Sequence, residues 1–229
     1  MSDLKKYFNR QTQLWGEKTQ ESLSQKNVLI IGSGGLGSAF GYALGSSGIG
    51  AISVVDFDRI ALENIHRQIL FSLEDIGEFK VDIFKKRLES RFDGVEISTY
   101  KTKADEFFDT FLQNKNLQIC KFDLILDATD NLQTRAQIDK FAKKLQIPWI
   151  FTSVDSWQTQ ICFIDKSDFR FFPSSSQKPA GITPPIVMLA GSFAANLALR
   201  YLANLQIQKD MLYYLDLFSG EFSLKKINL

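Results

Sequence analysis

The chain has 229 residues, of which 45% are hydrophobic and 23% charged, and its formal net charge is +1. This composition is typical of a globular domain that can bury a full core. The nearly neutral charge argues against a nucleic-acid partner, which usually requires a clear basic excess. The chain has no run of eighteen or more apolar residues and no signal peptide at its polar N-terminus, so we expect a cytoplasmic protein that does not interact with membranes.

Apolar runs alternate with amphipathic stretches through the first two thirds of the chain, which predicts a mainly parallel sheet with crossover helices. Strands are expected at 27–31, 51–55, 95–100, 123–127 and 148–152, and helices at 35–47, 77–91, 107–112 and 132–145. Two later strands, at 158–164 and 222–227, lack long crossovers. The predicted fold class is therefore α/β and Rossmann-like, with antiparallel strands extending the sheet in the C-terminal third.

Prolines, glycine and serines between residues 171 and 185 predict an exposed crossover loop. An Ala/Leu-rich helix is expected after it, at 186–205. Since no internal repeat or linker interrupts the pattern, we expect one domain covering 1–229.

A glycine-rich loop, Gly-Ser-Gly-Gly-Leu-Gly at 32–37, follows the first strand and opens a helix. Such glycines permit a tight turn and let backbone N–H groups approach a phosphate at the helix N-terminus, with Gly32, Gly34 and Gly35 as the contacts. Asp56 ends the next strand, 24 positions after Gly32, where a carboxylate can accept hydrogen bonds from ribose hydroxyls. These residues predict nucleotide binding but fit a nicotinamide-dependent dehydrogenase equally well.

Polar groups further along the chain favour ATP over a dinucleotide. Asn64, Arg67 and Gln68 form a cluster of amide and guanidinium groups, and a guanidinium can hold a triphosphate as a fork. Lys80 is expected at the start of a helix, where ammonium and helix N-terminus can both face phosphate. Taken singly, Arg67 and Lys80 also fit ordinary surface cations.

Asp130 and Asn131 follow the strand that ends at Asp127, at the sheet edge where open α/β folds bind ligands. A carboxylate there suits Mg²⁺, which takes one or two protein oxygens together with phosphates and water. The simpler alternative is that this pair only caps the next helix. Arg10 completes the set, outside the sheet and ahead of a helix.

Together these motifs resemble the ThiF/MoeB/HesA family, bacterial relatives of the ubiquitin-activating enzymes. The resemblance runs from about Phe8 to the end of the chain and is carried by residues 9–11, 32–37, 56–58, 64–68, Gly77 with Lys80, 127–131 and 181–185. It implies use of ATP and Mg²⁺, a ubiquitin-fold carrier protein ending in Gly-Gly, and a homodimer in which Arg10 acts in trans.

The expected activity is adenylylation of the carrier's C-terminal carboxylate with release of pyrophosphate. The pathway would be thiamin-thiazole or molybdopterin sulfur transfer, and of the two we favour the thiamin pathway. Asp56 is assigned to the ribose, Gly35 to backbone contact, and Asn64, Arg67, Gln68 and Lys80 to the phosphates. The expected nucleotide-binding set is Gly32, Gly34, Gly35, Asp56, Asp58, Asn64, Arg67, Gln68, Lys80, Asp130 and Asn131. The expected catalytic residues are Arg10, Arg67, Lys80 and the metal ligand Asp130. The one histidine, His66, has no acid–base partner in sequence and is interpreted as structural.

The chain departs from the family in its thiols. It contains no Cys-x-x-Cys pair, so no structural zinc is expected. The loop at 174–180 has no cysteine, while Cys120 and Cys162 lie beside or within apolar strands, so a thioester or acyl-disulfide step on this chain is doubtful. Two alternatives stay open: a non-catalytic subunit that binds nucleotide or carrier, and a nicotinamide dehydrogenase, which would need a second histidine or a Ser-Tyr-Lys set that the sequence does not show.

Overall fold

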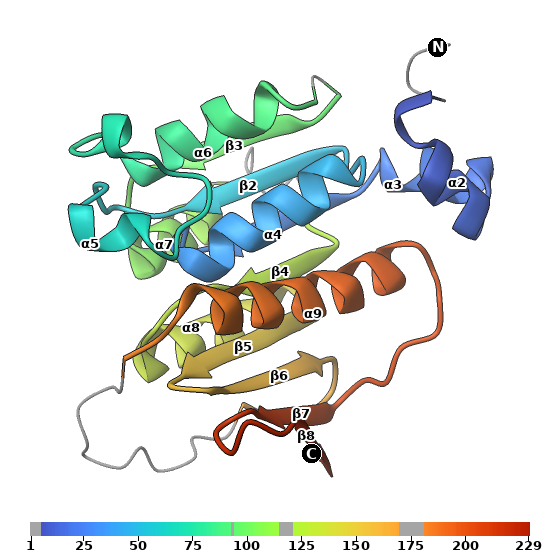
Figure 1. Cartoon of the computed structure of the whole chain (residues 1–229). Helices are drawn as coiled ribbons and strands as arrows, with labels where there is room; N and C mark the ends of the chain where they lie inside the picture. Colours follow the sequence, from blue (N-terminus) through green and yellow to red (C-terminus); the bar gives the residue numbers. More distant parts are fainter. Residues whose placement is uncertain (1–5, 93, 115–120, 170–180) are drawn as a thin grey trace.

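The computed structural model describes residues 6–92, 94–114, 121–169 and 181–229. An eight-stranded sheet crosses the molecule in the order β3-β2-β1-β4-β5-β6-β7-β8 (Figure 1). The strands are β1 (Asn27–Ile31), β2 (Ala51–Val55), β3 (Glu96–Tyr100), β4 (Leu124–Asp127), β5 (Trp149–Asp155), β6 (Gln158–Ile164), β7 (Met211–Asp216) and β8 (Ser223–Asn228).

The sheet is parallel from β3 to β5 and antiparallel from β5 to β8, which confirms the predicted mixed fold. Strand β1 lies between β2 and β4, and Ile31 at its end is paired in register with Asp127 at the end of β4. The strand order reverses at this point, because the chain continues outward from β1 in one direction and from β4 in the other. Ligands of open α/β sheets bind at such a switch point, beyond the carboxyl ends of the strands.

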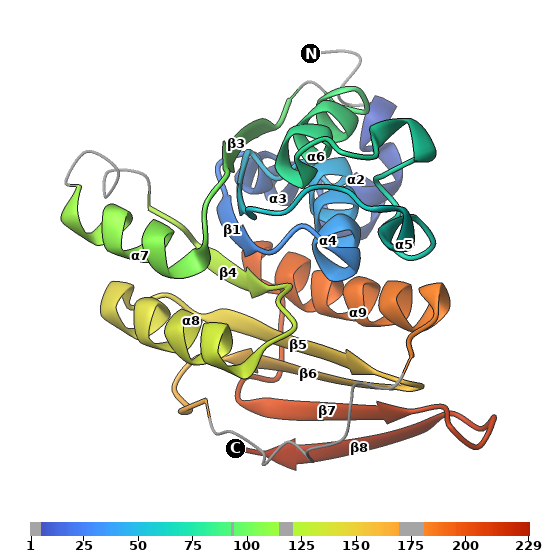
Figure 2. The same ribbon diagram turned by 90° about the vertical axis from the view of Figure 1, so that its left-hand side faces the viewer.

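Helices cover both faces of the sheet (Figure 2). On one face lie α4 (Gly35–Ser46), α6 (Lys80–Glu89) and α9 (Pro184–Leu202), and on the other lie α7 (Ala104–Gln113) and α8 (Leu132–Leu145). Successive residues of a buried strand point to opposite faces, so Val28 and Ile30 join the core under α4 while Leu29 and Ile31 join the core under α7 and α8. The remaining elements are α2 (Asn9–Trp15), α3 (Glu17–Leu23), α5 (Leu62–Ile65) and the 3₁₀ turn η1 (Leu73–Asp75).

Helix α9 is the one helix of the described chain that is long and apolar enough to cross a membrane by length and composition, yet half of that segment is buried inside the protein. It packs closely on α4: a Cβ added to Gly191 would lie 2.4 Å from the Cβ of Ala39. We therefore interpret α9 as a core helix of the folded domain.

The structure corrects the sequence predictions in three places. Pro184 and Pro185, which we expected in the loop, form the first turn of α9, where a missing N–H costs nothing, and the helix ends at Leu202. Strand β7 was not predicted at all. Arg10 lies within the short helix α2 rather than ahead of a helix. Most of the expected loop, at 170–180, lies outside the described residues.

Candidate active site

The glycine loop joins the end of β1 to α4 and lies against the segment that follows β4. Gly32 has a φ of +94°, and a Cβ added to it would lie 2.6 Å from the carbonyl oxygen of Ala128. A Cβ on Gly37 would lie 2.1 Å from the carbonyl oxygen of Gly32. Only glycine permits both the turn and these approaches, and the result is a helix N-terminus whose free N–H groups can bind an anion.

Asp56 ties this loop to the end of β2. Its Oδ2 accepts hydrogen bonds from the backbone N–H of Ser33 at 2.7 Å and from its hydroxyl at 2.8 Å. Its Oδ1 accepts one from the backbone N–H of Asp58 at 2.9 Å. A carboxylate has about four acceptor sites, so Asp56 holds the loop and keeps acceptor capacity for a ribose hydroxyl.

The Asn64–Gln68 cluster begins in α5 and turns back onto the glycine loop. Gln68 is 4% exposed, its Oε1 is buried without a hydrogen-bond partner, and its Nε2 would lie 3.4 Å from a Cβ on Gly34. The carbonyl oxygen of Arg67 would lie 3.2 Å from a Cβ on Gly35. The side-chain oxygen of Asn64 accepts the backbone N–H of Ala61 at 3.0 Å, and its NH₂ group makes no hydrogen bond within the described chain. The cluster thus presents donors beside the glycine loop.

Two cations face this edge with different local partners. Lys80 is the first residue of α6 and is 6% exposed, and its Nζ donates to Oδ2 of Asp58 at 2.7 Å. Asp58, expected only as a nucleotide contact, therefore also holds Lys80 in place. The guanidinium of Arg67 donates to the carbonyl oxygen of Glu63 at 2.7 Å and lies 2.9 Å from Nε2 of His66. His66 is exposed.

The segment after β4 carries Asp130 and Asn131. Asn131 is the N-cap of α8, where its side chain accepts the backbone N–H of Thr134 at 2.8 Å, so the capping role is real for this residue. Asp130 is exposed, and within the described part of the chain its carboxylate makes no hydrogen bond or ion pair. Its carboxylate is therefore available to a cation at the switch point, two residues after Ala128, which packs on Gly32.

Sequence reasoning missed the buried pair that underlies this segment. Asp127 is fully buried, and its Oδ2 accepts Nε of Arg135 at 2.9 Å. Burial raises the pKa of the Asp127 carboxyl, while the Arg135 guanidinium and the donors of Thr129 oppose that rise. An aspartate at the end of a buried strand, followed by an arginine in the first turns of the next helix, is the signal that could have revealed the pair.

Arg10 is not brought to this site by its own chain. It is exposed on α2, and α2 and α3 lie at the opposite end of the sheet from α5 (Figure 1). No residue of α2 is buried, and Leu14 on this helix is 77% exposed.

The described cysteine is unsuited to nucleophilic chemistry. Cys162 lies on β6 and is 1% exposed, and burial raises the pKa of its thiol to about 12. Cys120 and the loop at 174–180 lie outside the described residues. No group of three or more His, Cys, Asp or Glu side chains that could hold a metal ion occurs in the described chain. A site built from one carboxylate and the nucleotide's own phosphates is the arrangement that Mg²⁺ accepts.

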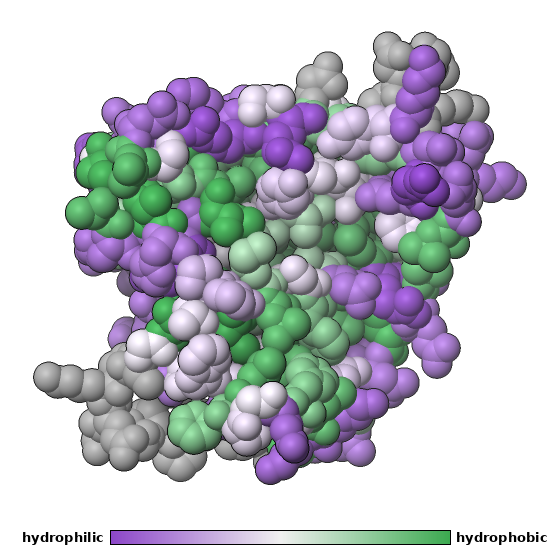
Figure 3. Space-filling view, viewed as in Figure 1, coloured by the Kyte–Doolittle hydropathy of each residue, from purple (hydrophilic) through white to green (hydrophobic). Residues whose placement is uncertain are grey.

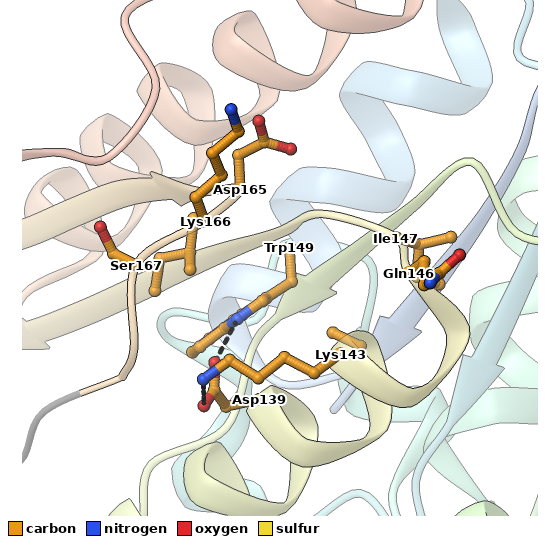
Figure 4. Close-up of a pocket in the computed structure, with 10 residues that line it drawn as sticks. Asp139, Lys143, Gln146, Ile147, Trp149, Asp165, Lys166 and Ser167 are labelled. Atoms are coloured by element: carbon orange, nitrogen blue, oxygen red, sulfur yellow. Dashed lines mark hydrogen bonds and ion pairs between the residues drawn. The ribbon is translucent and has the colours of Figure 1, made fainter.

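A cavity of about 370 Å³ lies at the amino-terminal edge of the sheet, between the end of α8, the start of β5 and the segment after β6 (Figure 4). Two of its charged groups pair with each other: Asp139 accepts hydrogen bonds from Nζ of Lys143 at 2.7 Å and from Nε1 of Trp149 at 3.2 Å, and Lys143 also pairs with Asp168. Since the glycine loop and Asp130 lie at the other edge, we place the candidate active site there.

A sequence model of the ThiF family matches residues 8–228. Among similar curated proteins, a sulfur carrier protein adenylyltransferase of Thermus thermophilus is 33% identical over 64% of this chain and 52% of its own length. A molybdopterin-synthase adenylyltransferase of Haemophilus influenzae is 29% identical over 92% of this chain and 88% of its own length. The sulfur carrier protein ThiS adenylyltransferase of Escherichia coli is 28% identical over 89% of this chain and 82% of its own length. The chain thus spans about half the length of the first of these relatives.

Solved structures share the fold. The crystal structure of PaaA superposes with a TM-score of 0.84 over 100% of this chain and 74% of its own, at 21% identity. That of Escherichia coli MccB with ATP gives a TM-score of 0.76 over 92% of this chain and 65% of its own, at 19% identity.

Proposed function

Because the chain belongs to the ThiF family, we propose that it is an ATP-dependent adenylyltransferase that activates the C-terminal carboxylate of a ubiquitin-like sulfur-carrier protein. The relatives named for adenylylation of sulfur carriers support this activity, and those of Haemophilus influenzae and Escherichia coli are covered over most of their length. In this proposal the whole chain acts as one adenylation domain in the cytoplasm, built on the single continuous sheet.

The observation that carries the proposal is the orphaned Oε1 of Gln68 beside Gly34. Buried polar atoms are nearly always hydrogen-bonded, and this amide oxygen can only accept, so it calls for a ligand group that donates, such as a nucleotide hydroxyl. Two cations are linked to the same loop: Lys80 pairs with Asp58, whose backbone N–H donates to Asp56, and the backbone of Arg67 lies beside Gly35. A nucleoside triphosphate fits this combination, because its hydroxyls can donate to the amide oxygen while its phosphates accept from the cations and the backbone N–H groups.

The chemistry asks for positioning and charge neutralisation more than for covalent participation. The carrier's carboxylate attacks the α-phosphorus of ATP, giving an acyl-adenylate and pyrophosphate. Asp56 would orient the ribose, and Arg67 and Lys80 would neutralise the phosphates. Asn64 and Gln68 would contact the phosphates through their amide N–H donors. Mg²⁺ would supply charge stabilisation at the phosphate oxygens, with the Asp130 carboxylate as its protein ligand.

We propose in addition that two copies of the chain form the active enzyme, with Arg10 completing the partner's site. Arg10 is remote from the glycine loop of its own chain, and α2 buries no residue. The face that carries α4, α5 and α9 shows apolar areas among hydrophilic ones (Figure 3). Large exposed apolar side chains on or near α5, η1 and α9 are Leu62, Ile69, Leu73, Ile76 and Met188. Exposed apolar patches often mark protein interfaces.

ATP–pyrophosphate exchange tests the proposal. A thiamin-type and a molybdopterin-type carrier, offered separately, would show which pathway the enzyme serves, and mass analysis of a small co-purifying Gly-Gly-ended protein would identify the natural carrier. Exchange should require carrier and Mg²⁺ and should fall about 10²–10³-fold in Asp130→Ala. Near wild-type exchange in Asp130→Ala would refute the metal assignment, and a larger thermal stabilisation by NAD than by ATP with Mg²⁺ would refute the activity itself.

A further inference from the structure

Arg135 is a buried cation with no direct place in the reaction. It lies in α8 and is 5% exposed, and its Nε donates to Oδ2 of the fully buried Asp127 at 2.9 Å. Removing two charges from water is costly, and replacing a buried ion pair with apolar residues of similar volume is often neutral or stabilising. Overall stability is therefore a weak explanation for this pair, and its geometry points to a role in fixing position.

The guanidinium joins three segments of the carboxyl edge. Its Nη2 donates to the carbonyl oxygen of Thr129 at 2.8 Å and to that of Thr152 on β5 at 3.0 Å. Its centre lies 5.0 Å from the ring of Phe151, also on β5. Arg135 therefore fixes the segment after β4 against the neighbouring strand from within α8.

Thr129, the residue immediately before Asp130, is held on three atoms. Its backbone N–H and its hydroxyl donate to Oδ1 of Asp127 at 2.9 Å and 2.6 Å, and its carbonyl oxygen accepts from Arg135. On the other side, Asn131 is held by its capping bond to Thr134. Asp130 is thus an exposed carboxylate between two anchored neighbours.

We propose that Arg135 and Asp127 are positioning residues that fix Thr129 and so aim the Asp130 carboxylate at the metal–triphosphate. This inference rests on the proposed function, in which Asp130 is the metal ligand. Groups that orient a metal ligand typically contribute 10–100-fold to metal affinity. The pair should therefore affect metal binding more than it affects binding of the nucleotide alone.

The test measures Mn²⁺ binding by electron paramagnetic resonance in the presence of a non-hydrolysable ATP analogue, together with binding of that analogue without metal and the melting temperature. In Arg135→Lys, a single ammonium cannot reproduce the three contacts, so the Mn²⁺ dissociation constant should rise about 10-fold or more. Thr129→Val removes only the hydroxyl bond and should weaken Mn²⁺ binding severalfold, whereas Thr129→Ser should restore it.

Arg87→Lys is the matched control, because Arg87 also bridges carboxylates, those of Glu74 and Asp75, but does so between α6 and η1 and does not contact the segment after β4. It should leave Mn²⁺ affinity unchanged. Wild-type Mn²⁺ affinity in folded Arg135→Lys would overturn the proposal, and if Arg135→Lys does not fold, wild-type affinity in Thr129→Val would do so. Asp130→Asn distinguishes failure of the proposed function from failure of this inference. Unchanged Mn²⁺ affinity in Asp130→Asn refutes the metal assignment. Reduced Mn²⁺ affinity in Asp130→Asn, together with wild-type affinity in Thr129→Val, refutes only the positioning role.

Discussion

Replacing Lys80 by methionine should separate catalysis from stability. Methionine keeps most of the apolar stem of this buried side chain but removes the ammonium that pairs with Asp58 at 2.7 Å. The Asp58 side chain is 48% exposed, so its carboxylate stays solvated after the change. A partly exposed pair of this kind contributes about 0–1 kcal/mol, and for a chain of this length 1 kcal/mol lowers Tm by about 2–4 °C.

The expected catalytic loss is much larger. Lys80 would neutralise charge on the triphosphate as the α-phosphorus is attacked, and losing one such contact commonly costs about 10²–10³ in kcat. The assay is ATP–pyrophosphate exchange at saturating Mg²⁺ and carrier, with Tm measured on the same preparation.

Lys26→Met provides the matched control. Lys26 pairs with Asp123 at 3.3 Å beside the start of β1, at the opposite sheet edge from the glycine loop. It should show a similar small Tm change and wild-type exchange. Exchange in Lys80→Met within about threefold of wild type, or an equal loss in both variants, would refute the assignment of Lys80 to the phosphates.

Three further outcomes are expected. Mixing inactive Arg10→Ala and Lys80→Ala proteins should restore activity at about a quarter of the sites, since mixed dimers carry one intact site; no recovery after verified subunit exchange would exclude action in trans. Burial raises the pKa of the Cys162 thiol from 9.0 to about 12, so at neutral pH its thiolate should be about 10³-fold scarcer than that of a free thiol. Cys162→Ser should therefore leave ATP–pyrophosphate exchange intact, and intact-mass analysis of the wild type should show no thiol-sensitive carrier adduct. Burial raises the pKa of Asp75, but hydrogen bonds led by Arg87 outweigh this and leave the pKa lowered. The stability that Asp75 contributes is therefore present above about pH 4, and the Tm difference between wild type and Asp75→Asn should shrink as the pH falls through the lowered pKa.

Several elements were predictable from local pattern alone. The buried runs at β1, β2 and β6 and the amphipathic stretch at α8 matched the structure residue for residue, because strand and helix periodicities differ and each run ends at a clear polar boundary. Strand β7, which pairs with β6 across a long sequence separation and with the adjacent β8, carries no clear alternation of polar and apolar residues and was missed.

The sequence by itself determined which groups are candidates for the site: the glycine loop, Asp56, Lys80 and Asp130 were assigned to it from residue type and from their positions at the ends of expected elements. Only the tertiary structure decided how they are held. Lys80 is positioned by Asp58 across 22 residues, and Thr129 by an arginine that also binds the carbonyl oxygen of Thr152 on another strand. Local spacing cannot predict such contacts, because they form only when the sheet brings the ends of β2, β4 and β5 to one edge.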